Sequence, residues 1–239
     1  MKRFWAKLIF PILNHTNSKY IIEIGAFKGE NTKNLVTFCQ LKNGKLTVID
    51  IDPQFDSNQY VQKFNHHYEL IQNYSLQELP FLSGYDSVLI DGDHNWFTVY
   101  HELTIIDNKL KDDETFPIIF LHDVEWPYAR RDMYYNPSSI PDEFLHPNST
   151  GGVAPGCSDL IDLDRMDDVE GAINHGMNHA LKEGGERNGV LTAIEDFLQT
   201  TSRAISFHRV SSFHGLGILS PSDPDLDSFI QDVIQRSGL

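Results

Sequence analysis

The 239-residue sequence contains few cysteines, few basic residues and no long apolar run. Its two cysteines, Cys39 and Cys157, are far apart and form no CxxC pair. We therefore expect no disulfide framework, and a reducing, cytoplasmic setting is the simplest interpretation. The early apolar run Leu8–Leu13 contains Pro11 and is too short for a signal-peptide core or a membrane span. We interpret it as part of a leading amphipathic segment.

Basic residues are outnumbered by acidic ones, 19 against 34, which gives a formal net charge of −15. Such a balance argues against nucleic acid or an anionic membrane surface as a partner. The 40% of hydrophobic residues suffices for an ordinary core, and the length fits one α/β domain with embellishments. A homo-oligomer is compatible with these numbers and stays open.

Short apolar runs alternate with amphipathic segments through the first half of the chain. The runs predict strands within residues 19–24 and 45–53 and at 68–72, 88–90 and 117–121, and the segments between them predict helices near 31–39, 76–79 and 97–110. Strands that alternate with helices at this rhythm are typical of a doubly wound α/β sheet. After a break, the chain predicts a helix at 190–198, two strands at 205–210 and 215–219, and a last helix at 226–234.

The break spans residues 124–186, which are rich in Pro, Gly, Asp, Tyr and His and have little periodicity. An irregular segment of this length in a compact domain is typically a lid or a binding loop. We therefore expect a single domain over residues 1–239, with 124–186 as an insertion or lid on the substrate side.

Glycines and two acids surround the first two predicted strands. Gly25 and Gly29 follow the first strand, Glu23 lies within it, and the second strand ends in Asp50. This spacing suits a βαβ nucleotide-binding unit, in which glycines let the backbone approach the ligand and the acid binds ribose hydroxyls. The two residues after Gly25 break the GxGxxG fingerprint, so a nicotinamide-dependent oxidoreductase is a weaker alternative.

Polar residues also follow two later strands. Asp91, Asp93 and His94 come after the strand at 88–90, and His122 and Asp123 come after the strand at 117–121. Ligands of open α/β sheets bind at this carboxyl edge, so we expect one site. A histidine beside carboxylates can take a proton from a hydroxyl. Two other interpretations stay open: Asp93 caps the next helix, and His122 with Asp123 forms a hydrogen-bonded pair without a metal.

The segment Glu23–Gly29, followed by Asp50, resembles the first two motifs of class I S-adenosylmethionine-dependent methyltransferases, and the last two predicted strands resemble the hairpin that closes their sheet. This resemblance implies a Rossmann-like, doubly wound, seven-stranded sheet with an antiparallel C-terminal hairpin. It also implies S-adenosyl-L-methionine as the cofactor. The implied cofactor-binding residues are Glu23, Gly25, Ala26, Phe27, Gly29, Asp50, Ser75 and Asp91.

The later motif pair is similar to metal-dependent sugar O-methyltransferases of macrolide and related antibiotic pathways, the macrocin and mycinamicin type. The likeness implies a divalent metal such as magnesium on Asp91, His122 and Asp123, with His122 where that family usually carries an acid. It makes His94 the catalytic base, with Asp93 beside it as a second catalytic candidate. The implied reaction is O-methylation of a small polar acceptor, a sugar or glycosylated metabolite. The alternative from another class is a catalytically degenerate cofactor-binding module that acts through a partner.

The irregular segment offers further candidates. Residues 125–137 are dense in aromatics and arginines, and they predict a substrate wall in which Trp126 or the tyrosines stack on a sugar and Arg130 or Arg131 holds an anion. Alternatively, the arginines pair with local acids.

Two further pairs of residues are interpreted as surface features. His175 and His179 have the spacing of a metal pair on a possible helix, but no third ligand accompanies them, so we expect surface histidines. Glu195 and Asp196 are expected on the exposed side of their helix.

Overall fold

The computed structural model describes residues 1–111 and 114–239. Their contacts form two compact units. The first unit comprises Met1–Gly92, Ile105–His122 and Ser202–Leu239, and the second comprises Asp93–Thr104 and Asp123–Thr201. The long α5 (Trp96–Lys109) begins in the second unit and ends in the first.

A seven-stranded sheet with the order β3-β2-β1-β4-β5-β10-β9 forms the first unit. Strands β1 to β5 are parallel, whereas β10 runs antiparallel to both β5 and β9. The order reverses between β1 and β4, which creates the switch point where doubly wound sheets bind ligands. The predicted seven-stranded sheet with its C-terminal hairpin is therefore confirmed. The strands are β1 (Tyr20–Ile24), β2 (Lys45–Ile49), β3 (Tyr68–Ile71), β4 (Ser87–Ile90), β5 (Ile118–His122), β9 (Ile205–Val210) and β10 (Leu216–Pro221).

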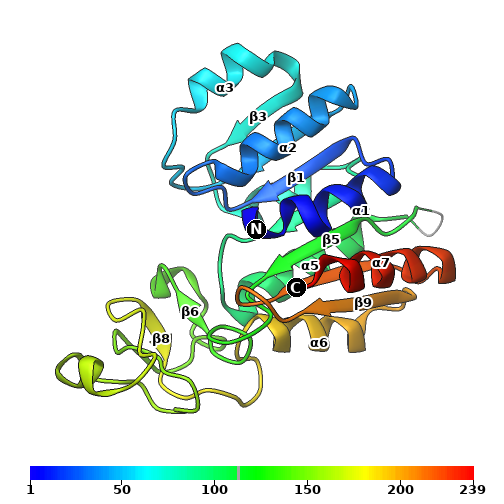
Figure 1. Ribbon diagram of the computed structural model, residues 1–239. Coiled ribbons are helices and arrows are strands. Elements are labelled where there is room, and N and C mark those ends of the chain that lie inside the picture. Colours follow the sequence, from blue (N-terminus) through cyan, green and yellow to red (C-terminus); the bar gives the residue numbers. More distant parts are fainter. Residues whose placement is uncertain (112–113) are drawn as a thin grey trace. The chain divides into compact units, whose positions relative to one another are not determined.

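Helices of the first unit pack against this sheet and bury an apolar core between them. Side chains of the N-terminal helical segment, of α2 and of α7 join inward-facing residues of the strands in one buried cluster. Figure 1 shows α1 and α7 side by side, both from this unit. The helical elements of the first unit are η1 (Lys2–Phe4), η2 (Trp5–Ile9), α1 (Phe10–His15), α2 (Glu30–Leu41), α3 (Ser57–Phe64), η3 (Asn65–His67), α4 (Ser75–Glu78), η4 (Leu79–Phe81) and α7 (Pro224–Ser237).

Capping residues set the ends of several helices. The Asp223 carboxylate accepts hydrogen bonds from the backbone N–H groups of Asp225 and Leu226 at the start of α7, and Gly238 ends that helix in the left-handed conformation. Asp56 caps α3 in the same way, through the N–H of Asn58. Helix α3 was missing from the sequence prediction, although this Asp-Ser start is a recognisable N-terminal signal.

The second unit contains a small antiparallel sheet with the order β6-β8-β7 and a buried polar interior. The sequence pattern did not predict this sheet, because strands of two or three residues are too short to show a period. The elements of this unit are β6 (Met133–Tyr134), η5 (Pro137–Ser139), β7 (Asn148–Ser149), η6 (Leu163–Asp168), β8 (Asn178–Ala180) and α6 (Val190–Thr200).

The sequence led us to expect neither a disulfide framework nor a membrane-spanning segment, and the structure bears on both expectations. Both cysteines are free thiols, and burial raises the pKa of Cys39 to about 12, so this thiol is protonated at neutral pH. Over residues 1–111 and 114–239, no helix combines the length and apolar character that a membrane crossing requires.

Candidate functional site

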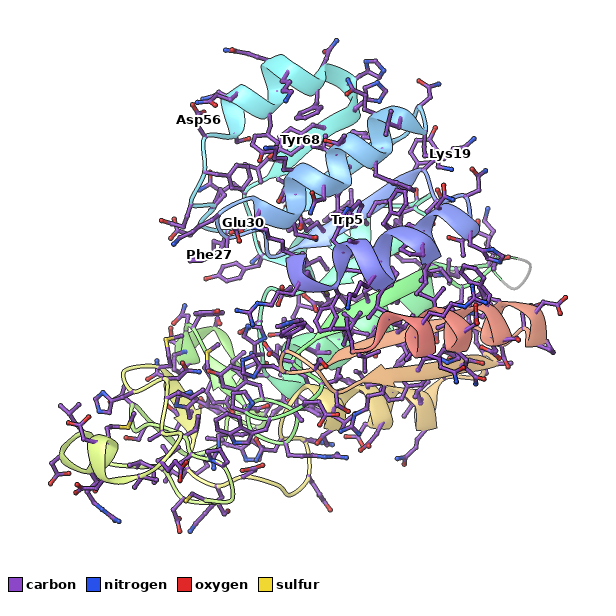
Figure 2. The ribbon with its side chains drawn as sticks, viewed as in Figure 1. Trp5, Lys19, Phe27, Glu30, Asp56 and Tyr68 are labelled. Atoms are coloured by element: carbon purple, nitrogen blue, oxygen red, sulfur yellow. The ribbon has the colours of Figure 1, made fainter. Side chains whose placement is uncertain are left out.

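The turn after β1 brings the backbone of the first unit close to the end of β4. Gly25 has φ of +81°, and a Cβ atom on it would lie 2.4 Å from the carbonyl oxygen of Asp91. Only glycine fits this approach. Gly29, with φ of +70°, then starts α2, and Figure 2 shows Phe27 and Glu30 beside each other at this end of the helix. The sequence motif therefore forms a tight strand–turn–helix at the switch point.

Asp50, at the end of β2, holds this turn in place. Its Oδ2 accepts hydrogen bonds from the N–H groups of Ala26 at 2.7 Å and Phe27 at 2.9 Å, and its Oδ1 accepts one from Asp52 at 2.8 Å. A carboxylate has about four lone-pair positions, so one position on Oδ1 is left for a ligand hydroxyl. The structure thus shows that Asp50 also stabilises the turn after β1.

Glu23 and Ser75 are both buried in the first unit. Glu23 lies on β1, and its Oε1 accepts a hydrogen bond from the Asn31 side chain at 3.0 Å. Burial raises the pKa of Glu23 to about 7, because a desolvated carboxylate is disfavoured. Ser75 begins the short α4 after β3. Neither position contradicts a role beside a cofactor, and both roles stay predictions.

Asp91 and His122 meet at the carboxyl ends of β4 and β5. The His122 Nδ1 lies 3.3 Å from Asp91 Oδ1, and the Met1 ammonium group donates to Asp91 Oδ2 at 2.9 Å. Asp91 therefore accepts positive or hydrogen-donating groups on both oxygens. The two strand ends are adjacent because β4 and β5 pair in parallel register, with Ile90 opposite Leu121.

A second carboxylate–histidine pair lies in the second unit. His94 Nδ1 is 3.1 Å from Asp123 Oδ2, and both side chains are buried. Asp123 adopts φ of +60°, a left-handed conformation that Asp tolerates better than most residues. The backbone of His94 is also held, because its carbonyl accepts a hydrogen bond from Met133 N–H at 3.0 Å.

Asp93 does not cap α5 through the backbone, so the capping interpretation of this residue is wrong. Asn95 has that position, with its Oδ1 accepting from the N–H of Thr98 at 2.8 Å. Asp93 instead accepts from the Thr98 hydroxyl at 2.8 Å and from the N–H of His94 at 3.2 Å. Burial raises the pKa of Asp93. Its carboxylate is thus engaged beside His94.

The arginines of the irregular segment are occupied by internal partners, as the alternative interpretation predicted. Arg130 forms a two-pronged ion pair with Glu195 at 2.5 and 2.7 Å. Arg131 is 1% exposed and donates to the backbone carbonyls of Ala180, Ser158 and Cys157. The prediction that either arginine holds a substrate anion is not supported by these contacts.

One other expectation for this part of the chain is wrong. His179 is fully buried in β8, not on a surface helix, and its Nδ1 bonds the Gly151 carbonyl at 2.9 Å. Helical spacing does not reveal such a buried polar contact. Glu195 and Asp196 are half-exposed on α6, where Asp196 accepts a hydrogen bond from the Trp96 indole at 2.7 Å.

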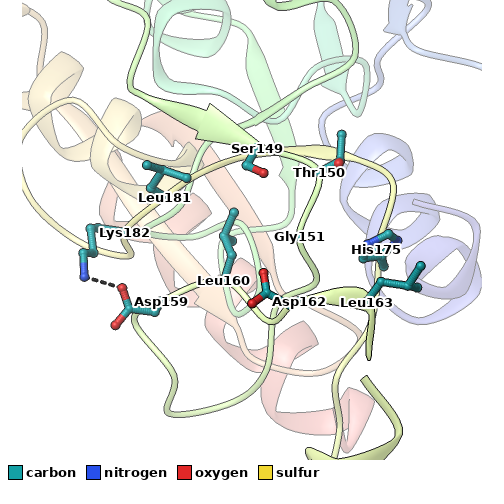
Figure 3. Close-up of a pocket in the computed structure, with 10 residues that line it drawn as sticks. All are labelled: Ser149, Thr150, Gly151, Asp159, Leu160, Asp162, Leu163, His175, Leu181 and Lys182. Atoms are coloured by element: carbon teal, nitrogen blue, oxygen red, sulfur yellow. Dashed lines mark hydrogen bonds and ion pairs between the residues drawn. The ribbon is translucent and has the colours of Figure 1, made fainter. Parts of the chain in front are cut away.

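His175 is exposed, as expected, and lines an open pocket of about 360 Å³ that lies wholly within the second unit (Figure 3). The pocket mixes hydroxyls, acids and leucines, and Lys182 pairs with Asp159 at its rim. None of the sequence-predicted catalytic, cofactor or metal residues lines it.

Sequence reasoning missed the residues that support His94 and the start of α5. Asp132 accepts hydrogen bonds from the N–H groups of Trp96 and Gly189 and from the Tyr134 hydroxyl, at 2.6–2.8 Å. Tyr128 stacks on the His94 ring. Both residues lie in the segment 125–137, whose density of aromatic and charged residues was the only available signal.

Comparison with known proteins agrees with this geometry. Residues 22–124 match a family model described as a methyltransferase domain. Among curated proteins, none matches the chain.

Solved structures share the fold at low sequence identity. The S-adenosylhomocysteine-bound methyltransferase PaMTH1 of Podospora anserina is 15% identical with a TM-score of 0.52, over 90% of this chain and 77% of its own. A caffeoyl-CoA O-methyltransferase, so described provisionally, from Staphylococcus aureus is 12% identical with a TM-score of 0.51, over 90% and 81%. The O-methyltransferase TomG of Streptomyces achromogenes is 11% identical with a TM-score of 0.50, over 91% and 79%.

The strand order and the matched domain agree with each other. The chain has a seven-stranded sheet with a reversed last hairpin and a glycine turn after β1, and residues 22–124 match a methyltransferase domain. Together they support an S-adenosylmethionine-dependent methyltransferase, the class that the motif resemblance implied.

Proposed function

We propose that this methyltransferase transfers a methyl group to a hydroxyl of a small polar acceptor, a sugar or glycosylated metabolite. The observation that carries the proposal is the buried pair of His94 and Asp123, with 3.1 Å between Nδ1 and Oδ2. A carboxylate that holds one imidazole nitrogen leaves the other nitrogen as a proton acceptor, which O-methylation requires.

His94 is the base in this proposal. Its Nδ1–H donates to Asp123, so Nε2 carries the lone pair that takes the proton from the acceptor hydroxyl. The Asp123 carboxylate then offsets the positive charge on the imidazolium ring. S-adenosylmethionine supplies an electrophilic sulfonium methyl when bound, so positioning the hydroxyl and removing its proton are the main tasks of the protein.

The residues of the glycine turn fit the cofactor. Gly25 lets the backbone come close at the switch point, and Asp50 keeps one lone-pair position for a ribose hydroxyl while it holds Ala26 and Phe27. Glu23, Gly29, Ser75 and Asp91 complete the proposed cofactor residues.

A divalent metal on Asp91, His122 and Asp123 is the second part of the proposal. The first two already approach each other at 3.3 Å, and Asp123 follows His122 directly in the chain. Magnesium prefers oxygen ligands, whereas imidazole also suits transition metals, so this donor set fits manganese or iron as well as magnesium. Such an ion would lower the pKa of the acceptor hydroxyl.

An aromatic side chain next to His94 supports a sugar acceptor. The ring of Tyr135 is 59% exposed, and its centroid lies 5.9 Å from that of His94. Exposed aromatic rings stack on the apolar faces of sugars. The match to a methyltransferase domain favours neither the oxidoreductase nor the degenerate-module alternative.

Isothermal titration with S-adenosylhomocysteine tests the cofactor site. We expect saturable binding, weakened by Asp50→Ala, because that change removes both the turn support and the ribose acceptor. Absence of binding at hundreds of micromolar would contradict the proposal.

Turnover tests the base and the acceptor. We expect S-adenosylhomocysteine to accumulate when a panel of monosaccharides and glycosides is supplied with S-adenosylmethionine, and His94→Gln to lose turnover while it keeps cofactor affinity. His101→Gln is the matched control, since that ring bonds the Phe97 carbonyl of its own helix. Equal loss in both variants removes His94 from the base role, and turnover that survives a chelator removes the metal.

A further inference from the structure

Three aromatic rings of the second unit are linked by stacked contacts, with Tyr128 as the shared ring. The ring of Tyr128 lies 5.3 Å from that of His94, with 17° between the planes. Tyr128 also stacks on His179, at 5.8 Å and 21°. All three residues are buried, so these contacts belong to the interior.

The hydroxyl of Tyr128 is fixed at the far end of its ring. Asn174 Nδ2 donates to it at 2.7 Å, and His179 Nε2 lies 3.4 Å away. His179 Nδ1 bonds the Gly151 carbonyl, which can only accept, so Nδ1 carries the proton and Nε2 is the acceptor. The Tyr128 hydroxyl therefore donates to His179, and two residues hold the ring.

The contact with Asp123 restrains the His94 ring at Nδ1, which lies 3.1 Å from the carboxylate oxygen. A contact at one atom leaves the imidazole free to tilt about that atom, and a tilt moves Nε2 away from a bound hydroxyl. A flat ring packed on one face removes this freedom, because a tilted imidazole would clash with it or lose its contact.

We propose that Tyr128 is a positioning residue that orients His94 by ring stacking, and that Asn174 and His179 hold Tyr128 in the required plane. This inference rests on the proposed function, because it requires His94 to be the catalytic base. The ring of Tyr128, and not its hydroxyl, touches His94, so Phe preserves the stacking and Leu removes it.

Nuclear magnetic resonance on the full chain with ¹³C-labelled histidine tests the geometry without any acceptor. His94 is assigned by the signal that His94→Gln removes. In the wild-type chain we expect ring-current upfield shifts of the His94 protons and cross-relaxation with the Tyr128 ring. Tyr128→Phe keeps both, whereas Tyr128→Leu loses both. Phe144→Leu, which removes a ring stacked on Trp96 in the same unit, leaves the His94 signal unchanged.

The absence of His94–Tyr128 cross-relaxation in the wild-type chain overturns the inference, and this measurement does not depend on any variant folding. An unchanged His94 shift in folded Tyr128→Leu overturns it equally.

Turnover on an acceptor found with the panel separates the inference from the proposed function. We expect Tyr128→Leu to lower kcat by about 100-fold, the effect of a small misplacement of a reacting group, with an unchanged KM for S-adenosylmethionine. Tyr128→Phe restores most of the turnover. Full turnover in Tyr128→Leu but not in His94→Gln overturns the inference alone, and full turnover in His94→Gln overturns the proposed base and the inference with it.

Discussion

Both units of the chain bury apolar side chains, but they differ in the polar side chains that they bury. In the first unit, the sheet and its helices bury a continuous apolar cluster that includes Phe4, Leu35 and Phe120. In the second unit, the fully buried side chains include Arg131, Asp132 and His179, and each bonds backbone groups of distant loops. Periodic secondary structure can be held by burial alone, whereas irregular chain needs partners for its own N–H and C=O groups.

Arg131 of the second unit shows how a buried polar side chain can satisfy backbone groups of irregular chain. Arg131 has five N–H donors in a rigid fork, and three carbonyls from residues 157, 158 and 180 accept from it. Burial lowers the pKa of Arg131. One side chain thus joins the end of β8 to the loop at residues 157 and 158.

The largest effect is expected for Arg131→Met. The apolar replacement fills a similar volume but leaves the three carbonyls without their donor, which destabilises the second unit by about 5 kcal/mol. Hydrogen exchange of the whole chain should show faster exchange across residues 123–201, with the amides of β1 and β4 protected as in the wild type. Equal loss of protection in both units would contradict the separation of their stabilising interactions.

A matching loss is expected in the first unit for Phe120→Ala. Phe120 lies at 0% exposure on β5, so the change leaves a cavity and costs about 4 kcal/mol in the free energy of unfolding. Urea unfolding measures the loss. Phe81→Ala is the control, because that ring is 82% exposed and its removal should change stability by no more than about 0.5 kcal/mol.

The pH dependence of stability tests the buried acid Asp132 of the second unit. Burial raises the pKa of Asp132 to about 6 from an ordinary value of 3.8, so between these values the folded chain keeps a proton that the unfolded chain loses. Stability due to this group therefore falls as pH rises through that window, by about 3 kcal/mol in all. The free energy of unfolding of Asp132→Asn, measured against the wild type from pH 4 to 7, should rise relative to it and then level off. A constant difference across that range contradicts the assignment.

The smallest effect is expected for Arg130→Gln. Arg130 neighbours Arg131, but its pair with Glu195 lies at the surface, with side-chain exposures of 38% and 41%. Solvent screens such pairs, so we expect a loss of about 0.5 kcal/mol that disappears in high salt. Urea titrations at low and high salt measure it. A loss as large as that of Arg131→Met would mean that charge, and not burial, explains the role of both arginines.

Much of the first unit could be predicted from its residues. Strands β1, β2 and β5 begin within a residue of the predicted positions, although β2 ends before the predicted Pro53, because parallel strands buried on both faces need continuous apolar runs. The polar groups at Asp91 and His122 lie at the expected strand ends and meet there. Helix α3 was missed, although Asp56 gave a capping signal.

The second unit and the partners of each site residue could not be predicted in this way. No spacing rule pairs His94 with Asp123, places Tyr128 against the imidazole ring, or puts Asp50 under the turn at Ala26, since these contacts join residues that are up to 34 positions apart. Such contacts depend on how the chain packs, and that packing involves many residues at once.

The local pattern of the chain thus determined the sheet, its strand ends and the glycine turn, since backbone conformation and apolar periodicity act over a few neighbouring residues. Tertiary structure alone decided which carboxylate holds which histidine and which buried polar groups support them, because burial forces each such group to find a partner wherever the fold brings one.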